Sequence, residues 1–212
     1  MKIKTVLFDF DGTIADTVDP VVDILNEFSA SWGEKAITPE ALEKYRSMRN
    51  QDAFKATGVP AYKVFFILRK VWKEIQERIP ELNCIKGIKP ALEQLDKDGF
   101  QLGIVTTGIK ENVLKFLKAN DLDMFDFIYD EKRMFGKKKA LKKVLKEKDL
   151  NPQEVIYVGD QTSDIDAAKS LGIKIIAVGW GFNKESILVE QEPEYFINEP
   201  KELIDILNST RK

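Results

Sequence analysis

Two aspartates close together near the start of the chain have the residue type and spacing for chemistry. Asp9 and Asp11 lie in the segment LFDFDGT (residues 7–13), where an apolar run stops at Gly12. On an extended strand, residues two apart point to the same side, so both carboxylates would face one way. Like charges at that spacing repel each other and need a cation nearby. Asp-Gly after a strand is also a common turn, so this segment alone leaves a structural role open.

Three other apolar runs are followed by polar residues of the kinds found in active sites. Open α/β sheets bind ligands outside the carboxyl ends of their strands, so these positions are candidates for one shared site. Taken alone, each of these segments could have only a structural role. GDQTSD could simply begin a helix, and TTG by itself does not indicate a function. Together, each at the end of a run, they indicate function. They are Thr106, Thr107 and Gly108 after the second run, Gly136 and Lys137 after the third, and Gly159, Asp160 and Asp164 at the fourth.

A divalent metal ion is the cation that best fits these carboxylates. Asp160 would arrive from a neighbouring strand and add negative charge to Asp9 and Asp11, so we expect an oxygen-ligated Mg²⁺. The chain has no histidine, which excludes histidine-ligated zinc and both serine–histidine–aspartate and cysteine–histidine hydrolysis. The chemistry must then come from carboxylates, lysine, hydroxyls, backbone amides and a hard metal.

Three consecutive lysines begin the helix predicted after the third run. Positive charge at a helix N-terminus opposes the helix dipole, so at least one of these lysines is expected to meet an anion. Lys137 is the strongest candidate because it follows Gly136 directly and lies closest to the strand end. An exposed basic patch is the alternative, and the choice among Lys137, Lys138 and Lys139 stays open.

These positions require strands and helices that hold them at one edge of a sheet. Five continuous apolar runs with β-branched or aromatic residues are typical of buried parallel strands. Helical patterns lie between the later runs, and Gly172 is expected to end the last of these helices. Alternating strands and helices predict a doubly wound α/β fold with a parallel sheet. The predicted strands are residues 5–10, 101–106, 125–130, 154–160 and 173–180, and the helical patterns are residues 110–120, 137–150 and 162–172.

Residues 16–84 differ from the rest because they lack strand signals and are rich in helix formers. We therefore predict an all-helical cap domain, residues 16–84, inserted into an α/β core domain of residues 1–15 and 85–212. The tail, residues 192–207, is typical of a short strand and a closing helix. Within the cap, the amphipathic spacing of residues 61–79 places near one face Val64, Phe65, Leu68, Val71, Trp72 and Ile75.

The composition narrows the partners and the cellular compartment that we expect for this protein. The chain has 212 residues, 43% of them hydrophobic, so it can bury a sizeable core. Its 33 basic and 35 acidic residues nearly cancel, so no broad positive field favours nucleic acid or anionic lipid. No apolar run has the length of a secretory signal or a transmembrane helix, so we expect a cytoplasmic protein. The single cysteine, Cys84, allows no internal disulfide and is expected to be a small buried hydrophobe.

In this order, the residues resemble the four motifs of the haloacid dehalogenase superfamily of aspartyl-phosphate hydrolases. DFDGT matches the first motif, Thr106 in IVTTG the second, Lys137 the third and GDQTSD the fourth. Lys138 stands where the family often has a proline. The resemblance covers essentially the whole chain, including a helical cap after the first motif, and implies that the first strand lies between the second and the fourth. AVGWGFN and the tail are similar to the phosphoglycolate phosphatase group and its pyrophosphatase relatives.

The resemblance implies a role for each motif residue. Asp9 would be the nucleophile that takes the phosphoryl group, and Asp11 would protonate the leaving oxygen and later take a proton from water. Asp11 also favours phosphate chemistry over dehalogenation, because expelling a halide needs no proton. The implied metal ligands are Asp9, Asp160 and the backbone carbonyl of Asp11, with Asp164 orienting the metal's waters or the lysine. The implied phosphoryl and substrate contacts are Thr106, Lys137, Gly12, Thr107 and Gly108.

The predicted activity is therefore hydrolysis of a small phosphorylated metabolite, by a monomer or a homodimer. A pyrophosphatase, a sugar-phosphate phosphatase and a phosphomutase are alternatives on the same scaffold. A signalling receiver domain also uses clustered aspartates, Mg²⁺, threonine and lysine, but it would phosphorylate an aspartate after its third strand, where Tyr129 and Asp130 offer no paired site. A catalytically inactive binding module is opposed by the presence of all four motifs.

Substrate choice is expected to come from the cap, because the core motifs contact only the phosphoryl group. The segment EKYRSMRNQDAF (residues 43–54) brings together Arg46, Arg49 and Asn50. These arginines could simply lie at an exposed helix end. Alternatively Arg49, or else Arg46, reaches the cleft when the cap closes and pairs with a second anionic group of the substrate, as in 2-phosphoglycolate.

Overall fold

A single parallel sheet forms the centre of the molecule. The structure is a computed structural model that describes residues 2–131 and 136–210. Its strands follow the order β3-β2-β1-β4-β5-β6 and every neighbouring pair is parallel. The predicted doubly wound α/β fold is confirmed, and β1 lies between β2 and β4. The strands are β1 (Thr5–Phe8), β2 (Gln101–Thr106), β3 (Phe127–Asp130), β4 (Val155–Gly159), β5 (Lys174–Val178) and β6 (Tyr195–Ile197).

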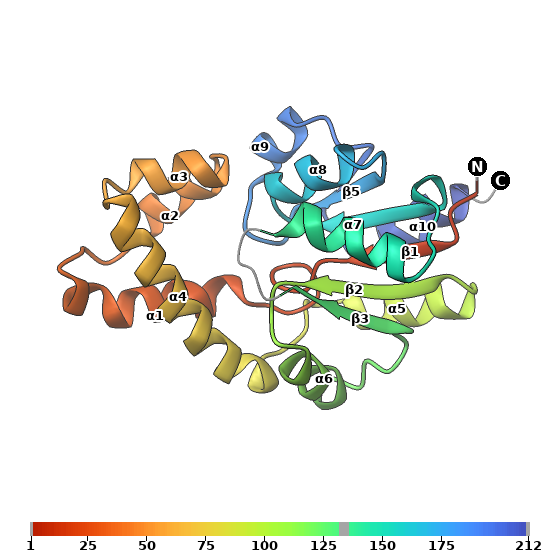
Figure 1. Cartoon of the computed structure of the whole chain (residues 1–212), viewed down its shortest axis with the longest axis horizontal. Helices are drawn as coiled ribbons and strands as arrows, with labels where there is room; N and C mark the ends of the chain where they lie inside the picture. The colour runs from red at the N-terminus through yellow and green to blue at the C-terminus, as the bar shows by residue number, and fades with distance from the viewer. Residues whose placement is uncertain (1, 132–135, 211–212) are drawn as a thin grey trace.

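Helices cover both faces of this sheet (Figure 1). Successive residues of β1 point to opposite faces, so Phe8 packs in one apolar cluster and Leu7 in the other. The helices on the Phe8 side are α5 (Ile88–Lys97), α6 (Lys110–Ala119) and α10 (Glu202–Ser209). The helices on the Leu7 side are α7 (Lys137–Glu147), α8 (Thr162–Lys169) and α9 (Glu185–Glu190).

Four of the five predicted strands are two or three residues shorter than the apolar runs, at one end or at both. β1 stops at Phe8 rather than at residue 10, since the carbonyl of Phe10 accepts hydrogen bonds from the amides of Ile14 (2.9 Å) and Ala15 (3.0 Å). The α8 helix ends at Lys169, earlier than predicted. Gly172 still closes that turn, with a φ of 67°.

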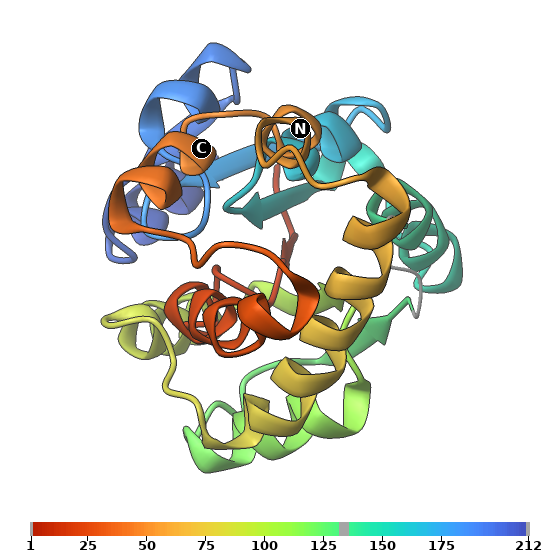
Figure 2. The ribbon, with the colours of Figure 1, turned by 90° about the vertical axis from the view of Figure 1, so that its left-hand side faces the viewer.

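Between β1 and α5 the described chain forms helices and no strand, as expected for residues 16–84. These helices lie beyond the carboxyl ends of the strands (Figure 1), and α1 and α4 cross in front of the sheet when it is viewed from that side (Figure 2). The expected apolar face of residues 61–79 is wrong at Phe65, which is 50% exposed, whereas Val71 and Ile75 are buried. The four α-helices are α1 (Val18–Ser29), α2 (Pro39–Arg46), α3 (Asn50–Ala56) and α4 (Ala61–Arg78), with 3₁₀ turns at Ala30–Trp32 and Ile79–Glu81.

Cys84 is only partly buried, at the edge of the apolar cluster on the Phe8 side. In residues 2–131 and 136–210, no helix is both long enough and apolar enough to cross a membrane.

Candidate active site

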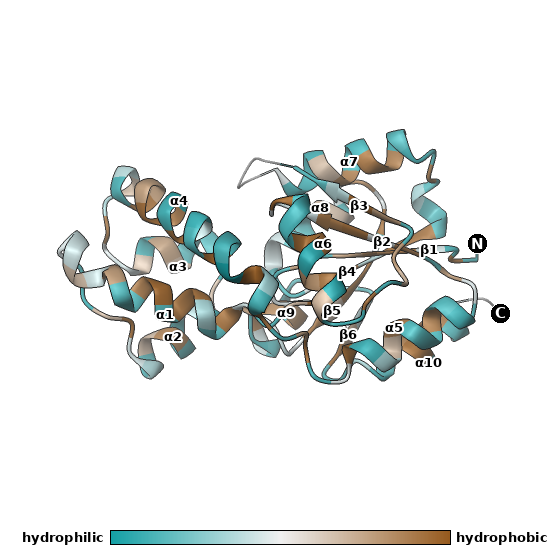
Figure 3. Cartoon of the chain, turned by 90° about the horizontal axis from the view of Figure 1, so that it is seen from below, coloured by the Kyte–Doolittle hydropathy of each residue, from teal (hydrophilic) through white to brown (hydrophobic). Residues whose placement is uncertain are grey.

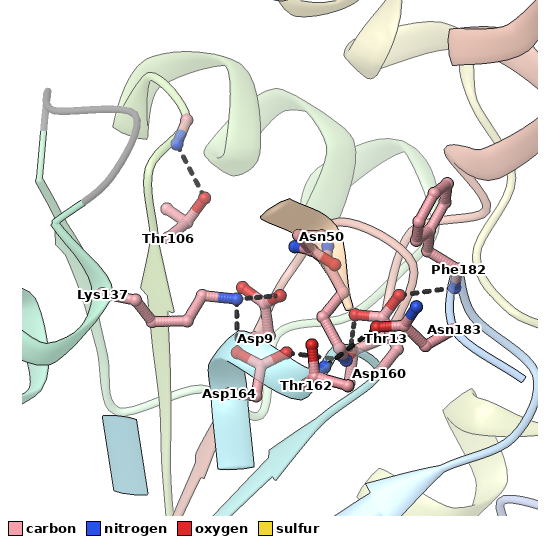
Figure 4. A network of polar contacts seen from close by, with 12 residues as sticks. Asp9, Thr13, Asn50, Thr106, Lys137, Asp160, Thr162, Asp164, Phe182 and Asn183 are labelled. Carbon is pink, nitrogen blue, oxygen red and sulfur yellow. Dashed lines mark hydrogen bonds and ion pairs between the residues drawn. The ribbon is translucent and has the colours of Figure 1, made fainter. Parts of the chain in front are cut away.

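Three carboxylates and one ammonium group meet at the carboxyl ends of β1 and β4 (Figure 4). Each of Asp9, Asp160 and Asp164 offers one oxygen, and these oxygens lie within 4.8 Å of one another. The Nζ of Lys137 donates to Asp9 Oδ2 at 2.7 Å and also pairs with Asp164. All three aspartates are buried, so these charges interact with little screening by water.

Asp160 is held by the loops that follow β1 and β5. Its Oδ1 accepts a hydrogen bond from the Thr13 hydroxyl (3.3 Å), and its Oδ2 accepts one from the Phe182 amide (2.6 Å). Gly12 lies against this carboxylate with a φ of 75°, and a Cβ at Gly12 or at Gly181 would collide with Asp160. Because Gly12 and Gly181 have no side chain, there is space for the Asp160 carboxylate.

Asp164 is fixed by the first turn of α8. Its Oδ2 accepts a hydrogen bond from the Gln161 amide at 2.9 Å, which forms a capping box at the start of the helix. The other oxygen of Asp164 pairs with Lys137. Asp164 therefore links the first turn of α8 to the Lys137 side chain.

Burial and mutual repulsion change the proton affinities in this cluster. Burial raises the pKa of Asp9 well above its ordinary value; Lys137 opposes this rise, while Asp164 and Asp160 add to it. Burial and the Asp164 charge raise the pKa of Asp160 to about 7. Burial also raises the pKa of Asp11 to about 6, against the opposing charge of Lys137. Burial disfavours the Lys137 ammonium, but Asp164 and Asp9 outweigh burial and raise its pKa.

The raised carboxyl pKa values predict that the metal-free protein loses stability as the pH rises. Asp160 and Asp11 ordinarily titrate near 3.8, so between about pH 4 and pH 7 the folded chain holds protons that the unfolded chain has released. With chelator present, we expect the melting temperature to fall by at least about 4 °C from pH 5 to pH 7.5. Asp160→Asn should weaken this dependence. A melting temperature that rises over this interval in the wild-type protein would contradict the prediction.

The second motif lies at the end of β2, beside this cluster. Thr106 is buried, and its hydroxyl oxygen accepts a hydrogen bond from the Gly108 amide at 2.8 Å. Thr107 is partly exposed. Figure 4 shows Thr106 above the side chains of Lys137 and Asp9. Thr106 ends the strand next to β1, which Asp9 follows.

Arg49 and Arg46 both contact the part of the chain that follows β4. Arg49 pairs with Asp166 on α8 and with Gln191, and Arg46 donates to the carbonyls of Phe182 (2.8 Å) and Gly181 (2.9 Å). Both guanidinium groups have these partners here, and contact of Arg49 with the substrate when the cap closes stays a prediction. The neighbouring cap residue Asn50 does lie close to the site (Figure 4), where its Nδ2 donates to Gln161 Oε1 at 2.6 Å.

Asn183 is a buried residue at the site, and no motif in the sequence predicted a role for it. Its Oδ1 accepts a hydrogen bond from the amide of Thr162 (2.9 Å), and its Nδ2 donates to the carbonyls of Arg46 (3.2 Å) and Met48 (3.0 Å). Asn183 therefore ties the start of α8 to the cap. In the sequence, Asn183 ends the segment AVGWGFN, which is similar to the phosphoglycolate phosphatase group. That position was the available sign that Asn183 belongs to the site.

A cavity of about 900 Å³ extends from the carboxylates into the cap. Asp11, Gly12 and Asp160 lie at its core end, beside Asn50 and Gln161. The rest of its wall comes mainly from α1 to α4 and the segments that join them, with Phe182 from the loop after β5. A molecule whose reacting group sits at Asp9 would have its remaining atoms in this cavity.

Residues 6–178 match the family model described as haloacid dehalogenase-like hydrolase. The match spans most of the chain and contains all four motifs. The chain therefore belongs to the haloacid dehalogenase-like hydrolase family. The resemblance stated from the motifs is confirmed, and the receiver-domain alternative is excluded.

Individual relatives cover nearly the whole chain. The phosphoglycolate phosphatase of Synechococcus elongatus is 28% identical over 203 residues, which are 95% of this chain and 96% of that protein. Pyrophosphatase PpaX of Bacillus mycoides is 28% identical over 213 residues, 98% of each chain. A haloacid dehalogenase-like hydrolase from Streptococcus pneumoniae shares the fold, with a TM-score of 0.81, 22% identity and coverage of 96% of this chain and 98% of that one.

Proposed function

We propose that this protein is a Mg²⁺-dependent phosphatase that hydrolyses a small phosphate monoester through a phosphoryl group carried on Asp9. The observation that carries this proposal is the buried cluster in which Lys137 pairs with both Asp9 and Asp164, with Asp160 alongside. A carboxylate attacks a phosphate dianion only where positive charge offsets the repulsion between them. The lysine supplies part of that charge, and three aspartates leave room for a cation to supply the rest.

The reaction uses the two aspartates of the first motif in turn. An oxygen of Asp9 bonds to phosphorus while the bond from phosphorus to the leaving oxygen breaks, and Asp11 gives that oxygen a proton. Water then attacks the phosphorus, Asp11 takes a proton from the water, and Asp9 is released with inorganic phosphate. A pKa of about 6 lets Asp11 both give and take a proton near neutral pH. Thr106 and Lys137 are proposed to bind the phosphoryl oxygens.

The donor set suits a hard divalent cation. The cluster offers carboxylate oxygens, which Mg²⁺ prefers, and burial together with repulsion from Asp164 raises the pKa of Asp160. The ion would be held by Asp9, Asp160 and the backbone carbonyl of Asp11. Asp164 would orient the waters on the ion or the Lys137 side chain. When bound, the ion would neutralise the carboxylates and the phosphate.

Chelation tests the proposed function directly. We expect the protein to release phosphate from para-nitrophenyl phosphate with Mg²⁺ present, to lose this activity in excess EDTA and to regain it when Mg²⁺ is restored. Asp160→Asn should require far more Mg²⁺, because it removes one ligand charge. Full activity in excess EDTA would overturn the metal assignment, and no hydrolysis of any phosphate ester would overturn the proposed function.

The names of the relatives suggest the first physiological compounds to test. One relative is a phosphoglycolate phosphatase and another is a pyrophosphatase, so 2-phosphoglycolate and pyrophosphate head the list. Sugar phosphates test the remaining alternatives, including a phosphomutase, which would isomerise a sugar phosphate instead of releasing phosphate.

A further inference from the structure

The cap cavity has the lining of a site for an apolar group. We infer that the preferred substrate is a phosphate monoester whose leaving group is uncharged and mostly apolar, with that group held in the cavity between α1 and α4. This inference rests on the proposed phosphatase activity and adds the class of the leaving group. It differs from the sequence-based expectation of a second anionic group bound by Arg49 or Arg46.

The walls of the cavity are mainly hydrophobic. Much of α1 is hydrophobic in Figure 3 although it lies outside the two helix layers of the sheet. At about 900 Å³, the cavity is near the top of the range of roughly 300–1,000 Å³ in which proteins bury drug-sized ligands. The side chains that carry this argument are Val21 and Leu25 from α1, Leu42 from α2, Phe54 from α3, and Ile67 and Leu68 from α4.

The charges of the lining oppose an anionic leaving group. Among the described residues of the wall, the one basic side chain is Lys35, which is exposed and lies between α1 and α2. Neither arginine of the sequence prediction lines the cavity, because each is paired with the core. A carboxylate buried here without a cation would carry a desolvation cost that no contact offsets.

The cavity continues directly from the catalytic groups, which indicates what occupies it. Asp11, the proposed proton donor to the leaving oxygen, lies in the same wall as the apolar side chains. The atoms bonded to that oxygen must therefore enter the space that begins at Asp11. Asn50 and Gln161 add polar groups near this entrance, where a polar atom close to the ester could be accepted.

A series of n-alkyl phosphates separates apolar binding from leaving-group reactivity, since the alcohols differ little in acidity. From ethyl to hexyl phosphate we expect kcat/KM to rise by about three- to fourfold per methylene, the factor that corresponds to the free energy of moving one methylene out of water. Hexyl phosphate should also exceed 2-phosphoglycolate. A flat series, or a preference for 2-phosphoglycolate over hexyl phosphate, would overturn the inference and leave the phosphatase activity standing.

A matched pair of variants locates the effect in the cavity. Ala41 on α2 lines the cavity, whereas Ala56 at the end of α3 is exposed and does not. Ala41→Phe should lower the ratio of kcat/KM for hexyl to ethyl phosphate by at least about tenfold, and Ala56→Phe should leave this ratio unchanged. If Ala41→Phe raises the melting temperature and keeps the ratio, the cavity is only a loosely packed cap interior and the inference fails.

Binding of alkylphosphonates gives a readout that does not need turnover. Calorimetry with Mg²⁺ should show that hexylphosphonate binds wild-type protein at least about tenfold more tightly than ethylphosphonate and phosphonoacetate. If no ester is hydrolysed, the proposed function fails and the substrate class with it, whereas the phosphonate comparison still decides whether the cavity binds an apolar group. Equal affinities would overturn it, and a graded series would support an apolar binding site.

Discussion

Asp9→Asn is expected to lower turnover by about four orders of magnitude or more, because an amide cannot take the phosphoryl group that the carboxylate would accept. The substitution keeps the size of a side chain that is buried against Lys137. The measurement is kcat for para-nitrophenyl phosphate, together with acid quenching of the enzyme on a ³²P-labelled ester. No labelled protein should be recovered from the variant, and retained turnover near the wild-type rate would exclude the covalent route.

Asp11→Asn is the matched control for this experiment, since it changes the same kind of group two residues away. Para-nitrophenolate leaves without needing a proton, so this variant should still form the phosphoenzyme. Breakdown should slow, because the attacking water loses its base, and labelled protein should accumulate. If both variants fail to label, the loss reflects a damaged metal site and gives no support to separate roles.

The arrangement of the motif residues could be predicted from the sequence because few geometric rules govern it. The carboxyl ends of parallel strands meet at one edge of a sheet, and apolar runs show where strands end. In the structure, Phe8 of β1 is in register with Ile104 of β2 and Val158 of β4. The side chains that follow these strands therefore meet whatever the details of the loops, and Asp9 and Asp160 do so.

The surroundings of the site depend on contacts between distant segments, which a hydropathy pattern does not encode. Arg49 pairs with Asp166 and Gln191, residues more than 100 positions away in the chain. The role of Asn183 arises because the loop after β5 folds back onto α8 and the cap. Local spacing could not predict the partners of either residue, because they depend on how residues 16–84 pack against the sheet and its loops.

The choice among the three lysines of the third motif can now be tested with internal controls. Lys137 pairs with Asp9 and Asp164, whereas Lys138 and Lys139 are exposed on the first turn of α7. Lys137→Ala removes a preorganised charge beside the phosphoryl group, so kcat should fall by about two to four orders of magnitude. Lys138→Ala and Lys139→Ala should each change kcat by less than about threefold, because solvent screens their charges.

The pH profile separates this electrostatic role from simple loss of structure. The Lys137 charge lowers the pKa of Asp9 and of Asp11, so its removal should raise both. The acid limb of kcat/KM for Lys137→Ala should therefore move to higher pH, and Lys137→Arg should return it toward the wild-type position because the charge is restored. A variant that merely unfolds would lose activity equally at every pH. If Lys138→Ala gave both the larger loss and the shifted profile, the catalytic lysine would be Lys138.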